Sequence, residues 1–157
     1  MKWSQWLQNW NMTGLRISPP LLDNDWKPSE HDRNAAWELY TELLTRIATQ
    51  DIAVSSGDEQ SALASIYSLF PTTRTIIKEN GRDCIEFTKL AIVVLNQKIR
   101  PFTSKWHKLS MEQGFNDAAL REEYGGELQA LQAVLRIYTG MLADMAGVED
   151  LTDLVRQ

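Results

Sequence analysis

The side chains best suited to chemistry in this chain are concentrated between Arg100 and Lys108. The stretch reads RPFTSKWHK and combines cations, hydroxyls, a tryptophan and a histidine beside a proline. Arginine and lysine donate charge-assisted hydrogen bonds to anions, tryptophan offers a stacking face for a base, and a helix restarting at Pro101 would add free backbone amides. We therefore predict a binding corner for an anion, a nucleotide or a nucleic acid, formed by Lys98, Arg100, Lys105, Trp106, His107 and Lys108.

The charge of the chain is unevenly distributed. No acidic residue lies between Phe87 and Met111, where five basic residues give +5, so the rest of the chain carries −10 and the whole chain −5. A protein with net negative charge does not follow a nucleic-acid backbone with its whole surface, which confines such a site to a local pocket. The alternative interpretation is structural, with these cations solvating a loop or pairing with acidic residues such as Glu112, Glu122 and Glu123.

The same stretch resembles the motif of one nuclease family. Arg100 and His107, with six residues between them, are similar in spacing to the arginine and histidine of the HEPN ribonucleases, which are helical bundles of about this size. The resemblance implies a metal-independent RNA-cleaving site formed by two paired subunits, in which His107 transfers protons and Arg100 holds the phosphate. This chain departs from the family pattern directly after the arginine, where Pro101 replaces a polar residue.

A broader resemblance covers residues 37–148. The segments LYxxLLxR (39–46), AIxVLN (91–96), RPFxxKWH (100–107) and AGV (146–148) are similar to small helical proteins encoded in bacterial anti-phage and conflict loci. No activity or site residue comes with this resemblance. It implies a setting, in which a small bacterial protein works beside larger effectors in antiviral defence.

The motifs of most other enzyme classes are missing from the sequence. It contains no phosphate-binding glycine loop, dinucleotide fingerprint, paired-cysteine zinc site or His-Glu-x-x-His motif. With only His31 and His107 available, a carboxylate-bridged di-iron bundle lacks its histidines. The single cysteine, Cys84, cannot form an intrachain disulfide and is typical of a small buried side chain. We predict a non-enzymatic protein with no metal and no cofactor, and the HEPN-like site is the enzymatic alternative.

Apolar periodicity predicts the elements that position these residues. Stripes with spacings of three and four predict helices from Ser29 to about Gln50, from Asp58 through Pro71 to Asn80, from Asp83 to Arg100, and from Asp117 to Gly147. No stretch alternates with period two for long enough to require a strand. The fold class is therefore all-α, a single-domain helical bundle of four to five main helices at residues 29–157.

Several breaks are predicted within and between these helices. Pro71 is expected to kink or restart the second helix, and Arg100–Pro101 is expected to break or bend the third helix. The third helix is also predicted to be the most buried. A polar turn is expected at 55–57, and Gly125–Gly126 is expected to bend the last helix where another backbone approaches.

Residues 1–28 form a separate tryptophan-rich arm. Trp3, Trp6 and Trp10 fall at helical spacing, which predicts a short helix. That helix cannot continue past Pro19–Pro20. The stripe either folds back to cover the bundle, which we favour, or docks into a groove of a protein partner, for which these three residues are the candidate interface.

Length and composition complete the prediction. A chain of 157 residues buries one core, and its longest apolar run, Leu90 to Leu95, is far too short for a membrane span. The N-terminus lacks a secretory signal, so we expect a cytoplasmic protein without membrane contact. The surplus of large apolar and aromatic side chains favours an interaction module that binds a protein partner or itself. The alternatives are the HEPN-like ribonuclease and a nucleic-acid-binding accessory subunit.

Overall fold

The computed structural model describes residues 1–12, 14–46 and 59–156, and these form an all-α single-domain bundle. Within the described ranges the only β-type pairing is an isolated bridge between Lys2 and Asp25. The predicted fold class is therefore confirmed. The α-helices are α1 (Trp3–Asn9), α2 (Pro19–Leu22), α3 (Glu30–Leu44), α4 (Glu59–Tyr67), α5 (Leu69–Asn80), α6 (Ile85–Val94), α7 (Arg100–Met111) and α8 (Ala118–Ala146).

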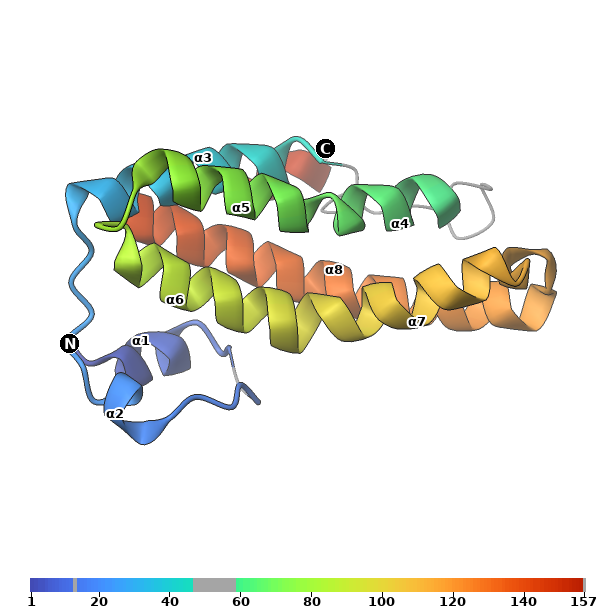
Figure 1. The fold of residues 1–157 in the computed structure, drawn as a ribbon, viewed down its shortest axis with the longest axis horizontal. Helices are drawn as coiled ribbons and strands as arrows, with labels where there is room; N and C mark the ends of the chain where they lie inside the picture. The colour runs from blue at the N-terminus through green and yellow to red at the C-terminus, as the bar shows by residue number, and fades with distance from the viewer. Residues whose placement is uncertain (13, 47–58, 157) are drawn as a thin grey trace.

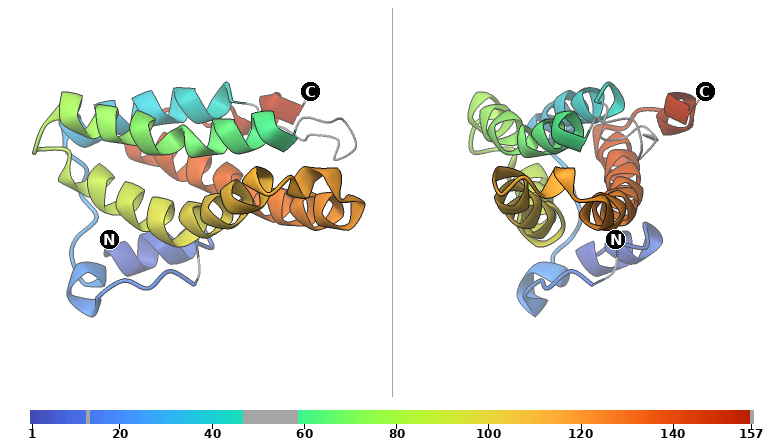
Figure 2. Two further views of the ribbon diagram at one scale, coloured as in Figure 1. Left: turned by 45° about the vertical axis from the view of Figure 1, so that its right-hand side comes forward. Right: turned by 90° about the vertical axis from the view of Figure 1, so that its right-hand side faces the viewer.

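The bundle consists of four columns (Figures 1 and 2). Two columns are the single helices α3 and α8, which pack extensively against each other. The other two are each built from consecutive helices, α4 followed by α5 and α6 followed by α7. The arm with α1 and α2 lies outside the bundle, against α6 and α8.

Helix α3 starts where the sequence predicts and ends earlier. The Ser29 side chain accepts a hydrogen bond from the Asp32 amide, and the Asp32 carboxylate accepts one from the Ser29 amide, which together form a capping box. The helix ends at Leu44, and both the amide and the hydroxyl of Thr45 donate to the Thr41 carbonyl in its last turn. The predicted extension over 47–50 and the predicted turn at 55–57 lie outside the described residues.

The two prolines act differently. Pro71 is the third residue of α5, so it lies in the first turn, where its missing N–H breaks no helical bond. Pro101 was expected to break or bend the third helix, with a basic corner after it. The α-helix is interrupted just before Pro101: α6 ends at Val94, a π-helical turn at Leu95–Ile99 leads into α7, and the column changes direction between the two helices (Figure 1). The Arg100 amide donates to the Leu95 carbonyl five residues back. The wider turn accommodates a residue that cannot make the ordinary bond, and residues 102–108 are helix rather than loop.

Helix α8 forms the core seam. The Asp117 carboxylate caps it by accepting hydrogen bonds from the amides of Ala119 and Leu120. Gly147, with φ of 73°, ends it. Seven apolar residues that recur along α8 at spacings of three and four are all buried, namely Tyr124, Leu128, Leu131, Leu135, Tyr138, Leu142 and Met145.

Two predictions about the long helices are wrong. Helix α6 is not the most buried, because Ile92 is 49% exposed and α8 contributes far more buried side chains. Helix α8 also runs without interruption through Gly125 and Gly126. Outside the backbone of α8 itself, no described atom lies within 4 Å of the position that a Cβ on Gly126 would take.

Candidate functional site

The basic pocket is a hollow of about 280 Å³ between α7 and the column formed by α4 and α5. It brings Arg100 and His107 together with residues that the sequence did not single out. Its lining residues are Tyr67, Phe70, Arg74, Arg100, Thr103, Ser104 and His107.

The α7 wall of the pocket follows from helical geometry. Residues three, four and seven positions after Arg100 lie on the same face of a helix, which places Thr103, Ser104 and His107 beside the guanidinium. The Thr103 hydroxyl donates back to the Arg100 carbonyl at 3.1 Å. Arg100, Ser104 and His107 are exposed, so their polar atoms face solvent and any bound group.

The opposite wall is largely aromatic. The Arg100 guanidinium carbon lies 4.6 Å from the centre of the Phe70 ring, and the Arg100 Nε donates to the Asn96 side chain at 3.0 Å. The His107 and Tyr67 rings lie with centres 6.0 Å apart and planes inclined by 27°. These contacts hold both α7 side chains against α4 and α5 and fix their direction.

None of the described residues that line the basic pocket carries a carboxylate. Among the residues that the structure describes, neither Arg74 nor Arg100 forms an ion pair with an acidic side chain. Guanidinium groups with unsatisfied donors bind phosphate or carboxylate oxygens, often through two parallel hydrogen bonds. The pocket can therefore hold an anion.

Three of the predicted cations lie elsewhere. Lys105 is clamped by Glu123 and Glu127 of α8, at 2.8 and 2.7 Å. Hydrogen bonds to these carboxylates raise the pKa of Lys105 above its ordinary value. Lys98 and Lys105 line a separate hollow with Glu127, and Lys108 is exposed outside both. Lys105 therefore has the structural role considered as the alternative in the sequence analysis, because acidic residues neutralise its charge.

Trp106 is not available for stacking, which corrects its assignment to the binding corner. Its side chain is fully buried, with the Phe115 ring centre at 6.1 Å and the Tyr124 ring centre at 5.1 Å. The indole points into the bundle because α7 is a helix and its core face includes Phe102 and Trp106, on the side away from His107.

The tryptophan arm folds back on the bundle, as favoured. Trp3 and Trp6 are each 1% exposed, so within this chain they are not a free surface for a partner. The Trp3 indole donates to Glu86, and the Trp6 and Trp10 indoles both donate to one Asp144 oxygen, at 2.7 and 3.3 Å. Burying an indole is favourable when its N–H finds an acceptor, and these carboxylates supply it.

Tyr67, Phe70 and Arg74 were not predicted as site residues. They precede Arg100 by 26 or more positions and belong to a different column of the bundle. Their spacing of three and four does place them on one helical face, but an exposed face with one arginine is common. Only the packing of α4 and α5 beside α7 identifies this face as part of the pocket.

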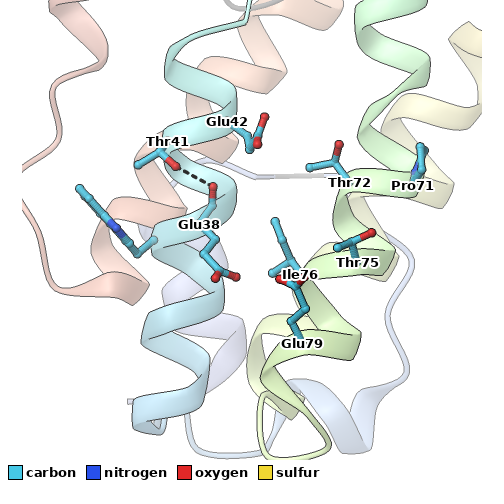
Figure 3. Close-up of a pocket in the computed structure, with 9 residues that line it drawn as sticks. Glu38, Thr41, Glu42, Pro71, Thr72, Thr75, Ile76 and Glu79 are labelled. Carbon is cyan, nitrogen blue, oxygen red and sulfur yellow. Dashed lines mark hydrogen bonds between the residues drawn. The ribbon is translucent and has the colours of Figure 1, made fainter.

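A larger groove of about 480 Å³ lies between α3 and α5 and contains none of the predicted site residues. Figure 3 shows Glu38 and Glu42 on α3 and Thr72, Thr75 and Glu79 on α5 along its two sides. Two of its carboxylates have protein partners. Glu38 accepts from the Asn80 amide group at 2.8 Å, and Glu42 accepts from Arg46 at 3.0 Å. The Glu38–Asn80 bond ties α3 to α5, and Arg46 also donates to the Thr72 hydroxyl of α5 at 2.9 Å, so the groove is part of that packing.

The chain matches no protein-family model, and no curated protein or solved structure shows detectable similarity to it. None of the helices in the described part of the chain is both long and apolar enough to cross a membrane.

Proposed function

We propose that this protein is a non-enzymatic helical module that binds a phosphate-bearing ligand in the basic pocket. One observation carries the proposal: Arg74 and Arg100 line a single pocket with His107 and three hydroxyl-bearing side chains, and none of the described residues that line it is acidic. Buried or clustered cations are normally neutralised by acidic neighbours, as Lys105 is here. A cationic pocket without such neighbours is suited to an external anion.

Neutralising the two arginines is expected to weaken phosphate binding by roughly 10- to 100-fold for each residue, because a hydrogen bond to a charged group is worth about 1.5–3 kcal/mol. The measurement is titration calorimetry of pyrophosphate at low ionic strength with wild type, Arg74→Gln and Arg100→Gln. Lys105→Gln is the matched control, since that lysine is held by Glu123 and Glu127 outside the pocket. Wild type that binds no pyrophosphate, or arginine variants that bind like the control, would contradict the proposal.

The proposed setting is a bacterial cytoplasm, where the module joins a protein partner or a second copy in an antiviral system. The resemblance of residues 39–46, 91–96, 100–107 and 146–148 to small proteins of conflict loci supports this setting. Several large apolar side chains also remain exposed, among them Trp37, Met111 and Leu154. Such side chains are typical contributors to interaction surfaces.

A second candidate function is metal-independent cleavage of RNA. It is favoured by one specific observation, that Arg100 and His107 line the same pocket and both are exposed. In this mechanism Arg100 would hold the scissile phosphate while His107 moves a proton at the reacting oxygen.

Under this second candidate, His107→Ala is expected to lower RNA cleavage in the presence of a chelator by at least about 100-fold, because removal of a general acid or base costs that much. Helical content, measured by circular dichroism, should be unchanged because the His107 side chain is exposed. Wild-type protein that leaves RNA intact excludes the ribonuclease and leaves the binding module standing.

A further inference from the structure

We propose that the ligand of the basic pocket is a nucleoside monophosphate, with its phosphate on Arg74 and Arg100 and its base on the ring of Tyr67. This inference rests on the proposed function and names the ligand class of the same pocket. It is drawn from three features: the difference between the two walls, the local charge and the limited extent of the cationic surface.

The two walls of the pocket recognise different chemical groups. The α7 wall offers the Arg100 guanidinium, the Ser104 hydroxyl and the His107 imidazole, which bind oxygen atoms of an anion. The facing wall offers Tyr67, whose side chain is 55% exposed. A half-exposed aromatic ring at the mouth of an anion site suits a ligand that joins a phosphate to a flat ring, because base and ring then both lose apolar surface to water.

The charge of the pocket matches one phosphate group. Arg74 and Arg100 contribute two positive charges, and no carboxylate lies among the lining residues. A phosphate monoester carries about −1.5 to −2 at neutral pH, since its second pKa is about 6. One terminal phosphate is therefore balanced by the two arginines.

The extent of the cationic surface limits the ligand to about one nucleotide. Proteins that bind single-stranded nucleic acid follow the backbone with a continuous basic groove. Here Lys105 is neutralised by Glu123 and Glu127, and Lys98 lines the other hollow. The pocket volume of about 280 Å³ is also near the lower end of small-molecule sites, roughly 300 Å³.

The test compares adenosine monophosphate, ribose 5-phosphate and inorganic phosphate by calorimetry at one salt concentration. Because stacking of a base on an aromatic ring is worth roughly 5- to 150-fold in affinity, adenosine monophosphate should bind tighter than ribose 5-phosphate by that factor. Tyr67→Leu should remove this difference without changing the affinity for ribose 5-phosphate, and Tyr67→Phe should retain it. Trp37→Leu changes another half-exposed aromatic on α3, outside the pocket, and should have no effect.

The outcomes separate this inference from the function on which it rests. If none of the three phosphates binds, the phosphate-binding function itself is wrong. If all three bind with equal affinity, or if Tyr67→Leu leaves the preference for the nucleotide intact, the function stands and the nucleotide inference fails. A single-stranded RNA 12-mer that binds tighter than the mononucleotide, with an affinity falling steeply with salt, would overturn the limit to one nucleotide.

Discussion

Trp106→Ala is expected to lower the free energy of unfolding by about 3–5 kcal/mol, the range for truncation of a buried large aromatic side chain. The Trp106 side chain is fully buried, and its ring packs edge-on against Tyr124 and parallel to Phe115. Alanine would leave a large cavity between α7 and α8, because the neighbouring rings cannot all move into it. Chemical denaturation monitored by circular dichroism measures the change.

The matched control for this prediction is Lys105→Ala, one position earlier on the same helix. Lys105 is exposed and its two ion pairs lie at the surface, so its loss should change the free energy of unfolding far less than the loss of Trp106 does. Equal destabilisation by the two variants would contradict the assignment of Trp106 to the core. The Trp106 indole Nε1 has no hydrogen-bond partner among the described residues, so the side chain is held there by packing and not by a hydrogen bond.

Gly140→Ala is expected to destabilise the protein by about 1–3 kcal/mol, the usual cost of overpacking a tightly packed site. A Cβ at Gly140 would lie 2.6 Å and 2.9 Å from two carbons of the Trp10 ring and 3.1 Å from an Asp150 oxygen. The ring would have to move, and that movement disturbs the hydrogen bond from Trp10 to Asp144. Hydrogen exchange of the arm amides should therefore accelerate together with the loss of stability.

Gly126→Ala in the same helix is the matched control and should have the opposite sign. It lies in the interior of α8 with open space around the new methyl group, so alanine should stabilise the helix by about 0.5–1 kcal/mol. Stabilisation by both substitutions would mean that the Trp10 ring does not rest on Gly140 in solution. The arm would then be attached through its other contacts, among them the Trp3 and Trp6 indoles and the Arg16–Gln97 hydrogen bonds.

The two stability predictions concern parts of the fold that relate differently to the basic pocket. Trp106 fixes the rotation of α7 about its axis, and that rotation decides which residues face α4 and α5. The arm packs on α6 and α8, away from the basic pocket. We therefore expect loss of Trp106 to affect ligand binding and disturbance of Trp10 to leave it largely unchanged.

Local patterns in the sequence determined most of the secondary structure. The capping box of Ser29 and Asp32, the glycine stop at Gly147 and the apolar stripe of α8 each depend on residues a few positions apart. Such features have fixed spacing in a helix, so the sequence displays them directly. The all-α class follows from the same periodicity.

The tertiary structure determined the backbone conformation around Pro101. A proline predicts a break or a bend because it lacks a donor, and here the interruption is a π-helical turn that joins α6 to α7 within one column. Whether a helix breaks or bends at a proline depends on its packing against the neighbouring columns, which are remote in sequence. Because residues 100–108 are helical, the residues of the predicted basic corner lie on different faces of α7.

The composition of the site also depended on contacts that no local pattern encodes. Arg100 and His107 were identified from their types and spacing, whereas Arg74 and Tyr67 joined them only because α4 and α5 lie beside α7. Trp106 and Lys105 were assigned to the corner by proximity in sequence, but a rotation of about 100° per residue placed one in the core and the other beside two glutamates. Side-chain type and helical spacing are local properties, while burial and charge pairing are set by the packing of distant segments.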